Sequence, residues 1–148
     1  MSIRMLTCMA KWHPVLYARL SPRANMDYAK QGGGYPFACA GVNIAFLLVD
    51  ALKLTRTGDP PSGGDAASVK ARKKLAVLVG DAGGGERAVC WVFACIFAAL
   101  DCEWERTGAT YMQFSQVVKT VRGALLQALG SMKVQSLQQL ATHLGVAV

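Results

Sequence analysis

The stretch AVCWVFACIFAAL (88–100) holds thirteen residues, and none of them is charged or polar in its side chain beyond two cysteines and a tryptophan. A helix that crosses a membrane needs about twenty consecutive apolar residues, so this length predicts a buried core helix instead. The stretch FACAGVNIAFLLV (37–49) is interrupted by Asn43 and leads to the same prediction. A chain of 148 residues can build one core of this kind without metals or disulfides.

Prolines, glycines and capping residues divide the rest of the chain into helical segments. Pro14 and Pro36 are placed where helices begin, Ser115 is a candidate N-cap, and Ser136 with Gln139 has capping-box spacing. Helices are expected over 3–11, from 14 onward, and over 36–57, 69–79, 86–105, 116–129 and 136–145. No segment shows strand periodicity. The sequence therefore predicts an all-α, single-domain bundle of about six helices, with 36–54, 88–104 and 116–129 in its core.

The stretch TGDPPSGGDAA (57–67) contains too much proline and glycine for regular structure. We expect it to be a disordered insert within the one domain. No signal peptide is evident at residues 1–14, and the five cysteines form neither a CxxC motif nor a metal-ligand pattern. They are predicted to be small buried hydrophobes, and the protein is predicted to be cytoplasmic in a eukaryotic cell.

The net charge is +7, and four basic residues fall within five positions, namely Lys70, Arg72, Lys73 and Lys74. Such a run is either a solvated helix face or a contact for anionic lipid at a membrane surface or for an acidic partner. Nucleic-acid binding is not predicted, because no interleaved aromatic residues or recognisable module accompany the run.

No catalytic residue, metal ligand or cofactor site is predicted. The stretch GDAGGGER (80–87) has the glycine spacing of a phosphate-binding loop, but Glu86 and Arg87 replace the lysine and the hydroxyl residue that the motif needs. His13 and His143 have no partner motif. Asp101 and Glu105 share a helix face, and a solvated helix end is expected there.

Four stretches carry a family resemblance: KWHPVLYARL (11–20), YPFACAGVNIAFLLVDALKL (35–54), FAALDCEWERTGATYMQFSQVVKTV (97–121) and KVQSLQQLATHL (133–144). Their order and spacing resemble the ELMO (engulfment and cell motility) domain. The strongest matches are Tyr35, Pro36, Phe37, Gly41, Asn43 and Ile44, followed by Asp101, Trp104, Ala109, Tyr111, Met112 and Phe114. Within this resemblance, Tyr111, Met112 and Phe114 look like a packed entry into the penultimate helix, which favours a structural role over a partner contact.

The resemblance implies regulation of small GTPases. One branch of the family activates GTP hydrolysis by Arf and Arf-like GTPases through an arginine in an FRGxG-like stretch, and the other branch is a non-catalytic scaffold beside DOCK-type exchange factors for Rac. The resemblance places the arginine stretch before residue 1, so an N-terminally incomplete ELMO-like domain over 1–148 is expected. None of the arginines in this sequence lies in a matching stretch, so GTPase-activating activity is not expected of this chain.

Overall fold

A computed structural model describes residues 2–52 and 66–147, and these residues form helices and no strand. The prediction of an all-α fold is confirmed. Seven α-helices lie in the described ranges, close to the six expected, and two short 3₁₀-helices accompany them. The elements are α1 (Ser2–Trp12), α2 (Pro14–Leu20), η1 (Ser21–Asn25), α3 (Phe37–Leu52), α4 (Ala66–Asp81), α5 (Gly85–Thr107), η2 (Tyr111–Gln113), α6 (Phe114–Gly130) and α7 (Leu137–His143).

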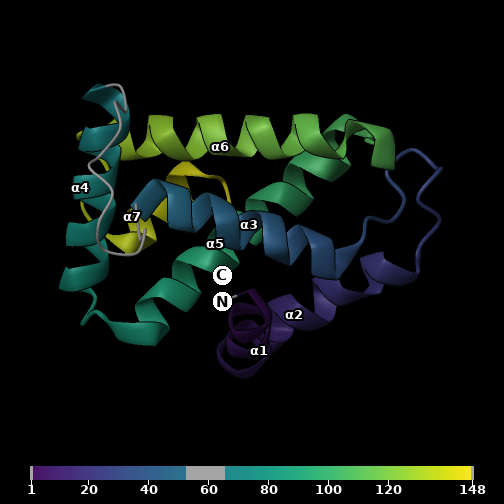
Figure 1. Cartoon of the computed structure of the whole chain (residues 1–148), viewed down its shortest axis with the longest axis horizontal. Coiled ribbons are helices and arrows are strands. Elements are labelled where there is room, and N and C mark those ends of the chain that lie inside the picture. The colour runs from purple at the N-terminus through teal and green to yellow at the C-terminus, as the bar shows by residue number, and fades with distance from the viewer. Residues whose placement is uncertain (1, 53–65, 148) are drawn as a thin grey trace, which may run out of the picture.

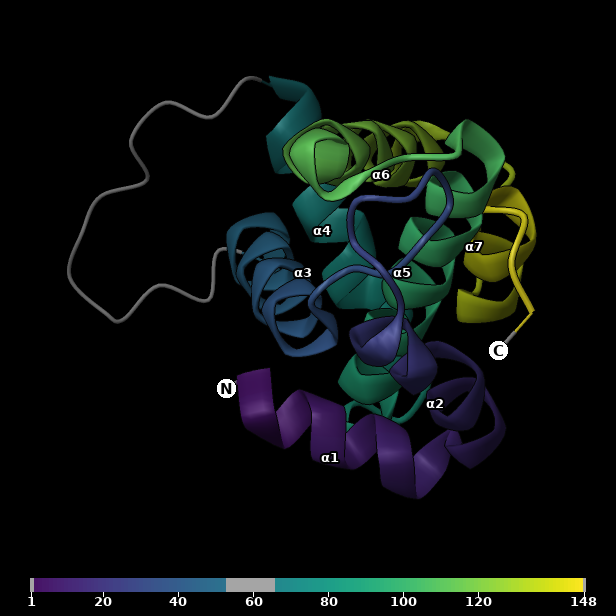
Figure 2. The same ribbon diagram turned by 90° about the vertical axis from the view of Figure 1, so that its right-hand side faces the viewer.

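Helix α5 is the axis of the fold. Every residue from Val92 to Asp101 is buried, and the helix packs against α1, α2, α3, α4 and α6. Figure 1 shows α6 and α3 running side by side with α5 behind them, and Figure 2 shows α1 lying across one end of this layer. The long apolar stretch thus forms the core helix that its length predicts.

Helix α3 flanks α5 rather than occupying the centre. Its sequence is apolar around most of the circumference, yet Phe46 is 69% exposed and Asn43 also faces solvent. Helix α1 approaches α3 closely at Gly41, where an added Cβ would stand 2.8 Å from Cδ2 of Leu6. A side chain at this position would fit only if the Leu6 side chain moved.

Helix α4 begins at Ala66, three residues before the expected start. The last two residues of the expected disordered insert therefore belong to this helix, and the remainder, 57–65, lies outside the described residues, as does the end of the expected 36–57 helix. Helix α4 stands at one end of α6 and packs against it (Figure 1).

The local capping predictions are mostly confirmed. Pro14 is the first residue of α2, and the Ser136 hydroxyl accepts a hydrogen bond from the backbone N–H of Gln139 at the start of α7. Ser115, in contrast, is not an N-cap, because α6 already begins at Phe114. The preceding turn η2 is held by a capping box of Thr110 and Gln113, which satisfies the backbone there.

None of the helices that the structure describes combines the length and the apolar character that crossing a membrane requires. All five cysteines are free thiols. Cys8, Cys90 and Cys95 are buried as expected, whereas Cys39 and Cys102 are exposed, so the prediction of burial is wrong for these two.

Candidate functional site

A buried polar cluster joins the first third of the chain to α5. The guanidinium of Arg23 donates from Nε to Oδ1 of Asp101 over 2.8 Å, and its Nη2 binds the carboxylate of Glu105. The Tyr35 hydroxyl donates to the same Oδ1 of Asp101 over 3.0 Å. Asp101 is 5% exposed, so the expectation of a solvated helix end is wrong for this residue. Glu105, one helical turn later, keeps contact with solvent.

The electrostatics of the cluster follow from this geometry. Burial opposes the charge of Arg23, but the hydrogen bond and the attraction of Asp101 outweigh it, so the pKa of Arg23 is raised. Burial and the neighbouring Asp101 carboxylate raise the pKa of the Tyr35 phenol, which stays protonated and able to donate. The cluster is therefore an ion pair with a neutral donor beside it, and it leaves no proton poised for transfer.

The glycines after Arg23 allow the chain to close over this cluster. Carbonyl oxygens of Gly32 and Gly33 accept hydrogen bonds from Arg23 and from Nε1 of Trp104, the latter over 2.9 Å. At Gly34 an added Cβ would stand 2.3 Å from the carbonyl oxygen of Arg23. The contacts of Arg23, Tyr35 and Gly33 with Asp101, Trp104 and Glu105 hold the loop on α5, so the geometry of the cluster favours a structural role.

The YMQF turn presents an aromatic surface next to this buried cluster. Tyr111 stacks between Tyr28 and Phe114, with ring centroids 6.2 and 6.5 Å away, and Phe114 also contacts the rings of Trp104 and Tyr35. Phe114 is partly buried, in keeping with the expected packing. Tyr111 is 51% exposed and Met112 87% exposed, so Met112 does not pack, and the partner-contact interpretation remains open for both residues.

Most arginines that the structure describes are engaged within the chain. Arg4 pairs with Glu86 at 2.6 Å, Arg106 with Glu103 at 2.7 Å and Arg122 with Asp50 at 2.8 Å. Arg87 lies over the ring of Trp12 at 4.9 Å, and Arg23 is held in the buried cluster. Arg19 and Arg72 form no ion pair with the residues that the structure describes. An arginine that stabilises charge on a partner's phosphate must instead project freely from the surface.

The four basic residues predicted as a surface contact all lie on α4, but they do not point the same way. Lys70 and Lys73 are exposed, whereas Arg72 and Lys74 are half-buried on opposite flanks of the helix. The ammonium of Lys74 donates to the carbonyl oxygen of Ser131, just past the end of α6. Lys74 therefore helps to hold α4 against the end of α6. Of the four basic residues, only Lys70 and Lys73 are exposed, which is fewer than the sequence suggests.

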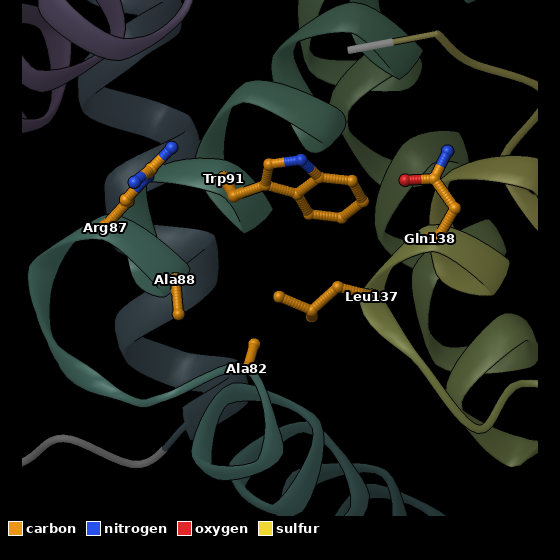
Figure 3. Close-up of a pocket in the computed structure, with 6 residues that line it drawn as sticks. All are labelled: Ala82, Arg87, Ala88, Trp91, Leu137 and Gln138. Atoms are coloured by element: carbon orange, nitrogen blue, oxygen red, sulfur yellow. The ribbon is translucent and has the colours of Figure 1, made fainter.

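A cavity of about 230 Å³ lies where the end of α4, the start of α5 and α7 meet. Figure 3 shows the Trp91 indole above it, with Leu137, Ala82 and Ala88 below and to the side and Gln138 at the far end. The guanidinium of Arg87 points away from the centre. The lining is apolar and lacks the convergent titratable groups of a catalytic pocket, so it fits an apolar side chain better than a reacting substrate.

Neither histidine enters a catalytic constellation. Burial and the nearby Arg87 lower the pKa of His13, and His143 lies exposed in the last turn of α7. Within residues 2–52 and 66–147, no three His, Cys, Asp or Glu side chains gather in a way that could hold a metal ion. Of the glycines in the GDAGGGER stretch, Gly80 lies in α4, Gly83 and Gly84 form the turn, and Gly85 begins α5, where Glu86 binds Arg4.

Comparison with known families identifies the chain. The model of the ELMO/CED-12 family matches residues 1–118, about four fifths of the sequence. No curated protein and no solved structure gives a significant match. The matched range includes the buried cluster of Arg23 and Asp101, the aromatic turn and the start of α6. The chain therefore belongs to the ELMO/CED-12 family.

Proposed function

We propose that this chain regulates small GTPases as an interaction module and does not itself accelerate GTP hydrolysis. The family supports the GTPase connection, with Arf and Arf-like GTPases as the first candidates. The proposal that the chain does not accelerate hydrolysis rests on its arginines. Five of the seven arginines that the structure describes contact Glu, Asp or Trp side chains of the same chain.

Catalytic activation would demand a free positive charge. An arginine supplied to a GTPase by its activator contributes a factor of roughly 10³ to 10⁵ to the rate by stabilising charge on the transferring phosphoryl group. An arginine already paired with a carboxylate would first lose that partner. Among the described arginines, Arg19 and Arg72 have no such partner, and the exposed pairs of Arg4, Arg106 and Arg122 are weak. None of these five arginines lies in a stretch that resembles the activating motif.

The second candidate is a scaffold beside a DOCK-type exchange factor for Rac. The exposed Tyr111 and Met112 favour it, because a rigid aromatic ring beside an exposed methionine is typical of protein-protein contacts. In either case residues 1–148 act as one ELMO-like domain, which is supported by a single core that extends from Met5 to Leu140. A cytoplasmic location in a eukaryotic cell belongs to the same proposal and is supported by the five free cysteines.

The test combines binding with single-turnover GTP hydrolysis by a panel of Arf and Arf-like GTPases, with and without saturating chain. We expect binding to at least one GTPase with less than a threefold change in rate, which is about 0.65 kcal/mol in the barrier. A hundredfold acceleration would contradict the proposal, and alanine substitution of each arginine in turn would then identify the one responsible. If no GTPase binds, the next measurement is binding of a purified DOCK-type exchange factor. Binding that Y111A/M112A weakens would support the scaffold function, and absence of binding would contradict both proposed functions.

A further inference from the structure

The contact between α4 and the end of α6 creates a surface that no single stretch of sequence contains. The ammonium of Lys74 donates to the carbonyl oxygen of Ser131, 57 residues away. Ser131 is the C-cap residue of α6, and its backbone N–H donates to the carbonyl oxygens of Gln127 and Ala128. Met132 and Lys133 follow Ser131 directly in the sequence, so their backbone lies within two residues of the carbonyl that Lys74 contacts. Figure 1 shows α4 upright at the end of α6, at the edge of the molecule.

The exposed side chains on this surface are of two kinds. Lys70, Lys73 and Lys133 are exposed cations, and Val77 and Met132 are apolar side chains that are 58% and 85% exposed. We call these five residues the α4 edge. Lys70, Lys73 and Val77 share the outward side of α4, because the inward side is occupied by the buried Ala71, Leu75 and Leu78.

The charge on the α4 edge has almost no acidic counterpart nearby. Residues 107–148 contain no acidic residue, and α4 itself contains only Asp81, two helical turns beyond Lys74. In the sequence, Asp59 and Asp65 precede α4. A surface that concentrates lysines and omits carboxylates attracts an anionic partner over about one Debye length.

We propose that the α4 edge binds the surface of a membrane that contains anionic lipid. Lysine carries a point charge on a flexible side chain, which suits lipid phosphate and carboxylate headgroups that move relative to one another. The rigid, planar guanidinium of arginine suits a fixed partner better. Val77 and Met132 would enter the boundary between headgroups and acyl chains, where apolar side chains gain free energy, whereas a carboxylate-rich protein surface would offer them nothing. Binding through so few side chains is weak and reversible, and it is independent of which GTPase the chain meets.

The experiment is co-sedimentation of the full chain with vesicles of phosphatidylcholine alone or mixed with phosphatidylserine. We expect binding only to the mixed vesicles and weaker binding at higher salt. The variant K70Q/K73Q/K133Q should reduce the partition coefficient about a hundredfold, since each lysine near an anionic surface contributes about a factor of five. Lys74 is left unchanged because it holds the end of α6.

The matched control is R19Q/K30Q/K119Q, three exposed cations that lie away from the α4 edge. It lowers the net charge by the same three units, from +7 to +4. It should keep at least a third of the wild-type partition coefficient, while V77Q/M132Q should remove the binding that persists at high salt. Equal losses in both triple variants would overturn the proposal, as would failure of the wild type to bind mixed vesicles. Capture by polyglutamate without capture by vesicles would assign the α4 edge to an acidic protein instead.

Discussion

Arg23 and Asp101 lie 78 residues apart in the sequence, and their side chains meet at 2.8 Å in the interior of the protein. The exposed fractions of the two side chains are 10% and 7%. A charge pair in such a place is sensitive to the loss of either partner, because the remaining charge stays buried without compensation.

Removal of the Asp101 carboxylate is the first prediction. We expect D101A to lower the free energy of unfolding by about 3 to 5 kcal/mol, since Arg23 and the Tyr35 hydroxyl would both lose their acceptor. The control is E105A, whose side chain is 62% exposed and which should cost less than about 1 kcal/mol. Urea unfolding followed by circular dichroism measures both. Similar losses in the two variants would show that the cluster is effectively solvated.

The close approach of α1 and α3 gives the second prediction. In G41A the new methyl group would stand 2.8 Å from Leu6, and we expect a net loss of about 1 kcal/mol despite the better helix propensity of alanine. G123A is the matched control, because an added Cβ at this position of α6 meets nothing within 4 Å. It should gain about 0.5 to 1 kcal/mol. In thermal unfolding, the melting temperature should be lower than that of the wild type for G41A and higher for G123A. Shortening the Leu6 side chain should remove the additional cost of G41A.

The aromatic turn before α6 contains two neighbours with different roles. F114A should lose about 2 to 4 kcal/mol, because it removes the ring contacts with Tyr35, Trp104 and Tyr111. M112A should stay within about 0.5 kcal/mol of the wild type, since this side chain is almost entirely exposed. The measurement is chemical denaturation at neutral pH. A large loss in M112A would mean that Met112 packs in solution.

A buried thiol on α5 predicts a dependence of stability on alkaline pH. Burial raises the pKa of Cys90 from its ordinary value of 9.0 to about 12. Between these values the folded state keeps a proton that the unfolded chain releases, so the stabilisation is complete below pH 9 and declines as the pH rises toward 12. The slope from one thiol is at most about 1.4 kcal/mol per pH unit.

The free energy of unfolding should therefore fall between about pH 9 and pH 12, and C90A should show a shallower decline than the wild type. C39A changes an exposed thiol and should follow the wild-type slope. Identical slopes in C90A and the wild type would assign the decline to other groups with raised pKa values, which include Tyr35, Cys8, Cys95 and Cys102.

Features that depend on neighbours in sequence were predictable. The uncharged run of 88–100 forms the most buried part of α5, and Pro14 and Ser136 begin helices as their chemistry requires. The family was also recognisable, because its signature residues lie in order along the chain and the family model matches 1–118.

Features that depend on distant residues were not predictable from pattern alone. Asp101 looks like part of an acidic helix end, and only the fold brings Arg23 to it. Phe46 lies in a run that is apolar on nearly every side, so the sequence does not say which side remains exposed. Lys74 is indistinguishable in sequence from Lys73, yet it turns to Ser131 because α4 crosses the end of α6.

The hydrogen bond from Trp104 to the carbonyl oxygen of Gly33 spans 71 residues, so it also bears on the order of folding. The chain must close a long loop before this bond can form, and the loss of entropy on closure delays such contacts relative to the pairing of α5 with α6. The glycine loop should then dock after the main folding barrier. Weakening it would leave the folding rate nearly unchanged and would let the protein unfold faster.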